Sequence, residues 1–185
     1  MPVKRRHSAL QAPNSTTFVT ITVVKFLPIF RNEALAQIVL DNAKIYAQKC
    51  HIQIHGFVLM PNHLHLLSTA GHQVSISQFM GRLKEYSAKE IIDWCLQNKK
   101  KDLLNAFSTA ATESKQGHKY QVWQKRFDQV VITRQEDLLI KLNYIHNNPL
   151  QERWGLCEKI EDYRYSSARC YITGEDAGIP IVKIT

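Results

Sequence analysis

The chain has 185 residues, 44% of them hydrophobic and 22% charged, which suits one soluble domain, or one domain with extensions, that buries a sizeable core. Its 24 Lys and Arg against 16 Asp and Glu give a net charge of +8, which favours polyanionic partners, nucleic acid first and anionic membrane second. The four cysteines are scattered and form no C-x-x-C pair, which argues against a zinc ribbon or a disulfide framework.

The chain begins with a basic arm over residues 1–15. Lys4, Arg5 and Arg6 are suited to contacts with DNA phosphates, although such an arm can equally be a solvated tail. No apolar core typical of a signal peptide follows the first methionine. The apolar stretch 18–30 is interrupted by a lysine and a proline and is too short to span a bilayer. We therefore expect a cytoplasmic protein without a membrane partner.

The first half of the chain predicts a strand, a helix and a hairpin. β-Branched residues favour a strand over Thr16–Val24, and Asn32 can cap a helix that starts at Glu33 and keeps a helical apolar period. Alternating apolar residues predict strands over His51–Met60 and His63–Thr69, joined by a short Pro-Asn turn. These two strands form a hairpin.

The second half predicts two further helices and a fourth strand. Ser75 or Ser77 can cap the first of these helices, which carries an apolar stripe. Residues 99–121 are polar and charge-mixed, and we interpret them as an insert or a partly mobile loop. The fourth strand is predicted over Phe127–Thr133, and a last helix over Gln135–Asn148, where a proline ends it.

The order strand, helix, strand, strand, helix, strand is that of ferredoxin-like (split βαβ) domains. We therefore predict an α+β fold over residues 16–150, with a four-stranded antiparallel sheet and helices on one face. A C-terminal helical extension over residues 151–185 follows this domain. Because the architecture carries many functions, it does not predict one by itself.

Two histidines in the predicted third strand are candidate metal ligands. Side chains alternate along a strand, so His63 and His65 share one face while Leu64 points to the other. Two imidazoles can share one divalent ion, and such an incomplete shell leaves positions open for substrate oxygens. A His-x-His pair can also be a surface or hydrogen-bonded pair without a metal, so the assignment depends on the rest of the chain.

A candidate nucleophile lies near the end of the last predicted helix. Tyr144 and Asn148 lie at i and i+4 on one helix face, so Tyr144 can attack a phosphodiester while the Asn148 amide oxygen supplies a third metal ligand. Free tyrosine has a pKa of about 10, and a metal would help chiefly by polarising the phosphate. Tyr86 is a rival nucleophile by position, and Tyr144 can alternatively be a core aromatic residue.

A short segment before the fourth strand interleaves an aromatic ring with positive charge. Trp123 can stack on a base while Lys125 and Arg126 neutralise phosphates. Trp123 can equally be a core residue that opens the strand. Binding through phosphates would be sensitive to salt.

Four segments carry a family resemblance: Met60–Leu67, Trp123–Phe127, Tyr144–Pro149 and Glu161–Ala168. Their order and rough spacing resemble the REP-associated branch of the single-tyrosine HUH transposases, a class of insertion-sequence enzymes whose motif is His, a hydrophobic residue, His. The resemblance implies a ferredoxin-like HUH domain that uses Mg²⁺ or Mn²⁺. It also implies cleavage and rejoining of single-stranded DNA near small hairpins through a 5′-phosphotyrosine intermediate.

Carried over by position, the resemblance implies that His63 and His65 are metal ligands and that Tyr144 is the nucleophile. Asn148 fits the ligand one turn after that tyrosine, where some relatives carry Gln. The oligomeric state stays open between monomer and homodimer.

The main alternative is a nucleic-acid-binding module of the same fold without catalysis. Histidine-triad hydrolases need a third alternating histidine, but the chain has Leu67 at that position. Two-motif phosphoesterases need a second His-x-Thr or His-x-Ser, which the sequence lacks. A zinc-binding interaction domain would need cysteines that are absent from the required spacing.

Overall fold

A four-stranded antiparallel sheet forms the centre of the structure, a computed structural model that describes residues 15–114 and 117–184. The sheet has the order β2-β3-β1-β4 and consists of β1 (Thr16–Thr22), β2 (Ile52–Met60), β3 (His63–Ala70) and β4 (Asp128–Ile132). One helix separates β1 from β2, and helices separate β3 from β4. This order and connectivity confirm the predicted ferredoxin-like fold.

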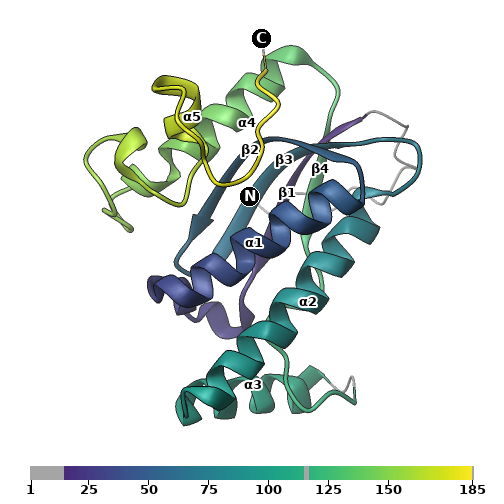
Figure 1. Cartoon of the computed structure of the whole chain (residues 1–185), viewed down its shortest axis with the longest axis vertical. Coiled ribbons are helices and arrows are strands. Elements are labelled where there is room, and N and C mark those ends of the chain that lie inside the picture. The colour runs from purple at the N-terminus through teal and green to yellow at the C-terminus, as the bar shows by residue number, and fades with distance from the viewer. Residues whose placement is uncertain (1–14, 115–116, 185) are drawn as a thin grey trace, which may run out of the picture.

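Two long helices, α1 (Glu33–Lys49) and α2 (Ile76–Gln97), lie side by side over one face of the sheet (Figure 1). Asn32 caps α1 as predicted, and Ser75 rather than Ser77 caps α2. Alternate strand residues meet the apolar stripes of both helices in the main hydrophobic core, whose buried members include Val19, Ile21, Leu35, Val39, Leu64, Leu66, Phe79 and Leu83. This packing matches the period of 2 along the strands and of 3.6 along the helices.

The opposite face of the sheet is covered by α4 (Gln135–Asn147) and the residues after it (Figure 1). A second buried cluster joins this helix to the sheet and consists of Phe18, Val58, Met60, Leu67, Leu142 and Ile145. The C-terminal residues add three short helices, η3 (Asn148–Leu150), η4 (Ile160–Asp162) and α5 (Ala168–Ile172). The sheet therefore lies between two layers, which explains why β3 is buried along nearly its whole length.

Residues 99–121, predicted as an insert or a loop, are largely helical. α3 (Lys101–Ser114) turns one face inward through Phe107, Ala110 and Ala111, at positions i, i+3 and i+4. Two of these three residues are alanines, so the apolar stripe is narrow and the surrounding polar residues concealed it in the sequence. The prediction of a loop was therefore wrong for Lys101–Ser114.

Short 3₁₀ helices, η1 (Val24–Phe26) and η2 (Ile29–Arg31), connect β1 to α1. Further along the chain, α4 ends at Asn147, one residue before the predicted end of this helix, and Pro149 lies in η3. None of the helices formed by the described residues is long and apolar enough to cross a membrane.

Candidate active site

β3 carries His63 and His65 on the sheet face that α4 covers. Their Nε2 atoms lie 3.1 Å apart, and the two residues are 9% and 5% exposed. Leu64 points into the main core on the other face of the sheet. The alternation predicted from the sequence therefore holds, and the two imidazoles form a buried pair at the start of β3.

The second nitrogen of each imidazole has its own hydrogen-bond partner. His63 Nδ1 lies 2.6 Å from Asn62 Oδ1, and the amide nitrogen of Asn62 donates to the Phe26 carbonyl. Since an amide oxygen only accepts, the Nδ1–H of His63 donates to it and Nε2 keeps its lone pair. His65 Nδ1 lies 2.8 Å from Thr20 Oγ1. Metal-binding histidines are commonly oriented by such contacts at the other ring nitrogen.

Both imidazoles are neutral at pH 7. Burial, together with the nearby Arg153 guanidinium, lowers the pKa of His63 to about 4. Burial also lowers the pKa of His65 to about 3, with added contributions from His63, Lys141 and Arg153. A neutral imidazole is the form that ligates a metal ion, so the site needs no deprotonation before an ion binds.

Tyr144 of α4 lies against this pair. Its ring centroid is 5.4 Å from that of His65 and 5.9 Å from that of Phe18, both in edge contacts. The residue is nevertheless 39% exposed, so a substrate can reach it. The ammonium group of Lys141, one helical turn earlier, lies 5.8 Å from the Tyr144 ring centroid. The structure thus combines a tyrosine, a cation and two imidazoles in one place.

The rival nucleophile, Tyr86, lies elsewhere. It belongs to α2, on the sheet face opposite the imidazole pair, and stacks on Tyr46 at 4.7 Å between ring centroids. It is 42% exposed, so accessibility alone would not separate it from Tyr144. Their positions do separate the two tyrosines, because Tyr144 lies beside His65 whereas Tyr86 lies on the other sheet face.

Asn148 begins η3, directly after α4, and its side chain is fully buried. Neither of its amide atoms hydrogen-bonds to any of the described residues. Buried polar groups are rarely left unpaired, so we expect the Asn148 amide to have a partner that is not among the described residues. Within the same described residues, His, Cys, Asp and Glu form no cluster of three or more that could hold a metal.

A family model described as "Transposase IS200 like" matches residues 17–148. The chain belongs to the IS200-like transposase family. Among solved structures, a REP-associated tyrosine transposase bound to a REP hairpin aligns with a TM-score of 0.63 and 15% identity, over 100% of this chain and 94% of that one. At this identity the likeness supports the fold alone.

A putative transposase from Deinococcus radiodurans R1 aligns with a TM-score of 0.44 and 19% identity, over 77% of this chain and 97% of that one. This likeness is too remote to support an inference. The curated proteins include no match to the transposase.

Three residues beside the site of the transposase were not predicted. The Trp154 ring lies 5.9 Å from that of His63, with the Arg153 guanidinium 5.7 Å above the indole. The Nζ atom of Lys141 lies 4.9 Å from the Phe18 ring centroid. The spacing of Lys141 and Tyr144 at i and i+3 was readable from the sequence. The approach of the C-terminal residues to His63 is a tertiary contact, which no local pattern indicates.

The predicted DNA-binding residues differ in how far they are exposed to solvent. Trp123 is only 4% exposed, and its indole N–H donates to Ser87 Oγ over 3.0 Å. It is therefore a core residue, so the prediction that its ring stacks on a base is wrong for this structure. Lys125 and Arg126 are exposed, as phosphate contacts require. The basic arm, with Lys4, Arg5 and Arg6, lies outside the described residues.

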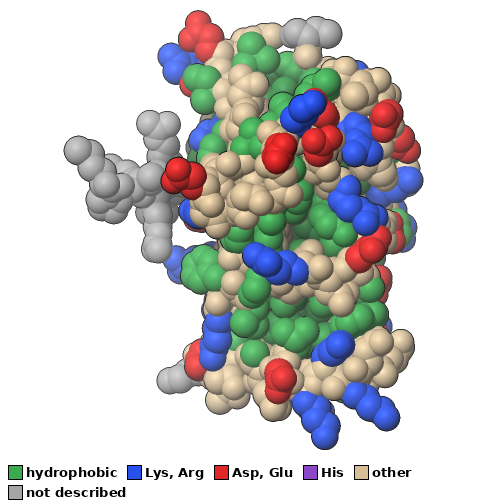
Figure 2. Space-filling view, turned by 90° about the vertical axis from the view of Figure 1, so that its left-hand side faces the viewer, with side chains coloured by type: hydrophobic (Ala, Val, Ile, Leu, Met, Phe, Trp, Pro, Cys, Tyr) green, Lys and Arg blue, Asp and Glu red, His purple; other side chains and the backbone are tan. Residues whose placement is uncertain are grey.

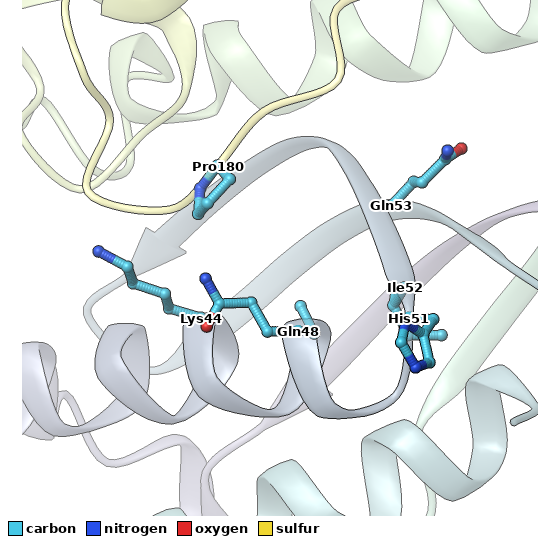
Figure 3. A pocket seen from close by; sticks show the side chains of 7 residues that line it. Lys44, Gln48, His51, Ile52, Gln53 and Pro180 are labelled. Carbon is cyan, nitrogen blue, oxygen red and sulfur yellow. The ribbon is translucent and has the colours of Figure 1, made fainter.

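A surface pocket of the transposase lies apart from the candidate site. A pocket of about 340 Å³ lies between the end of α1, the start of β2 and Pro180, and its labelled lining includes Lys44, Gln48 and His51 (Figure 3). None of the candidate site residues lines it. On the face seen in Figure 2, Lys and Arg are interspersed with Asp and Glu around a hydrophobic centre. Positive charge therefore forms no continuous patch on that face.

Proposed function

We propose that this IS200-like transposase cleaves and rejoins single-stranded DNA near hairpins, with Tyr144 as the nucleophile. One observation carries the proposal. The Tyr144 ring packs against His65, whose Nε2 lies 3.1 Å from that of His63. A nucleophile beside two neutral nitrogen donors is the arrangement that metal-assisted phosphodiester chemistry requires.

The donor set fits Mg²⁺ or Mn²⁺. The Nε2 atoms of His63 and His65, 3.1 Å apart, would both be near enough to hold one ion. With His63 and His65 as two donors, the unpaired amide oxygen of Asn148 supplies the third. When bound, such an ion polarises the scissile phosphate and neutralises charge that develops in the transition state.

In the proposed reaction, Tyr144 forms and later breaks the covalent bond with the DNA. The Tyr144 oxygen attacks phosphorus and loses its phenolic proton to solvent, while the bond from phosphorus to the 3′-oxygen breaks. The leaving 3′-oxygen takes up a proton, and the 5′ end stays on Tyr144 as a phosphotyrosine. The reverse attack by a 3′-hydroxyl restores the phosphodiester and frees the tyrosine. The Lys141 ammonium, beside the ring, favours the developing phenolate.

The proposed partner is single-stranded DNA that contains a hairpin. A structural neighbour of this fold is bound to a REP hairpin, and the net charge of +8 suits a polyanion. We assign phosphate contacts to Lys125 and Arg126, which are exposed beside β4, and to the basic arm. A non-catalytic DNA-binding module remains the alternative, because the same charges would serve it.

Covalent capture on a denaturing gel tests the proposal. The full chain is mixed with labelled hairpin-bearing single-stranded DNA and Mn²⁺. We expect an adduct that is lost with EDTA, in Tyr144→Phe and in His63→Ala. Tyr86→Phe is the matched control, since it removes an equally exposed tyrosine on the other sheet face. An adduct lost only in Tyr86→Phe would reassign the nucleophile, and hairpin binding without any adduct would favour the binding module.

A further inference from the structure

Ser167, in the C-terminal extension, links the tyrosine helix to the sheet. Its backbone N–H donates to the Phe57 carbonyl over 3.0 Å, and its Oγ accepts the Phe57 N–H over 2.9 Å. The same Oγ lies 2.9 Å from Nε2 of His146, which belongs to α4. One fully buried hydroxyl thus connects β2, the extension and α4.

His146 lies on the side of α4 away from Tyr144. Successive residues turn by about 100° around a helix axis, so these two residues point about 200° apart. Tyr144 contacts His65 of β3, whereas the His146 ring is buried beside that of Tyr171, with 5.2 Å between centroids. The hydroxyl of Tyr171 donates in turn to the His55 carbonyl of β2. The extension therefore holds the helix from the side opposite the candidate site.

α4 also makes apolar contacts with the sheet, beside the contacts of its Tyr144 ring with His65 and its Lys141 ammonium with Phe18. Leu142 and Ile145 pack over Gly56, where an added Cβ would lie 2.6 Å from Leu142 Cδ1. Apolar contacts fix how closely the helix approaches but have little directional preference, so they tolerate a rotation about the helix axis. Hydrogen bonds depend steeply on angle and distance. The bond between His146 and Ser167 is therefore a directional contact that favours one rotation of α4.

We propose that His146 and Ser167 are positioning residues that fix the rotation of α4, and with it the place of the Tyr144 hydroxyl against the imidazole pair. The inference rests on the proposed function and adds a requirement to it. Through this bond, Ser167 of the C-terminal extension acts on the reaction by positioning α4.

The test compares three variants of the full chain: His146→Ala, His146→Gln and His55→Ala. A displacement of about 1 Å at a reacting group lowers a rate by about 100-fold. We expect His146→Ala to slow adduct formation at saturating hairpin DNA by about 10- to 100-fold, with unchanged hairpin affinity. His146→Gln keeps a hydrogen-bonding group at the Nε2 position and should recover most of the rate.

His55→Ala is the matched control. The His55 side chain also bonds the C-terminal tail, at the Val182 carbonyl, and the Thr69 hydroxyl of β3, and neither of these bonds involves α4. It should lower stability without a selective loss of rate. Equal losses of rate in His55→Ala and His146→Ala, in proportion to their stability, would overturn the proposal.

Hydrogen–deuterium exchange separates this inference from the proposed function. His146→Ala should speed exchange along α4, and His55→Ala should not. If the wild-type chain forms no adduct but α4 exchange responds in this way, the positioning contact stands and the proposed chemistry fails. If adduct forms and His146→Ala changes neither its rate nor α4 exchange, the positioning role is refuted.

Discussion

Gly56 is where the tyrosine helix comes closest to the sheet, so Gly56→Ala is a sharp test of how α4 is placed. The new Cβ would lie 2.6 Å from Leu142 Cδ1 and 3.5 Å from Ser167 Oγ. Carbon atoms in contact prefer about 3.5–4.0 Å, so α4 or the Leu142 side chain must move by about 1 Å. Overpacking of this kind costs about 1–3 kcal/mol.

A second effect offsets part of this loss. Replacing glycine by alanine at a position without backbone strain contributes about 0.4–1 kcal/mol by restricting the unfolded chain. The expected net loss in the free energy of unfolding is therefore about 0–2.6 kcal/mol. The same displacement at Tyr144, two residues after Leu142, should slow adduct formation by about 100-fold. The rate should thus respond far more than the stability.

Urea unfolding and covalent capture measure the two effects on the same samples. Leu142→Val removes the atom that the new Cβ meets, so the double variant should recover part of the rate lost in Gly56→Ala. Gly81→Ala, on α2, has no atom within 4 Å of its added Cβ and is the control. It should stabilise the chain by about 1 kcal/mol. A Gly56→Ala variant with wild-type rate, or a double variant as slow as the single, would refute the close docking of α4.

Three further predictions concern the site and the DNA. Trp123→Ala should lower the free energy of unfolding by about 3–5 kcal/mol in urea titrations, whereas a base-stacking Trp123 would instead weaken hairpin binding in a folded protein. Replacing Lys125 or Arg126 by Gln should reduce the slope of log affinity against log salt by about 1 each, measured by fluorescence anisotropy; an unchanged slope would remove them from the interface. Asn148→Asp should bind Mn²⁺ more tightly by calorimetry yet form adduct more slowly, and equal metal affinity would remove residue 148 from the ligand set.

The fold and the histidine pair followed from local periodicity. Alternation along β3 placed His63 and His65 opposite Leu64, and the cap of α1 was readable at Asn32. The helix period also predicted one face for Tyr144 and Asn148, although α4 ends at Asn147 and Asn148 begins η3. These features depend on neighbours within one element or one hairpin, where the sequence carries the information directly.

The remaining features depend on contacts between distant elements. Trp154 reaches His63, and Ser167 reaches His146 and β2, only because the extension folds across the sheet. The close approach at Gly56 likewise needs α4 in place. Composition also misled at α3, because alanines supply much of its buried face. A single sequence holds no local signal for such pairings.

The proposed donors, two imidazoles and one amide, are all neutral, which bears on the substrate. Burial keeps the pKa of His63 and His65 well below 7, so neither ring adds charge there. An ion held by neutral donors keeps its full double charge for phosphate oxygens, and Lys141 and Arg153 add positive charge beside it. A carboxylate at position 148 would hold the ion more firmly while cancelling part of the charge that attracts the phosphate. Asn148→Asp should therefore change metal affinity and rate in opposite directions.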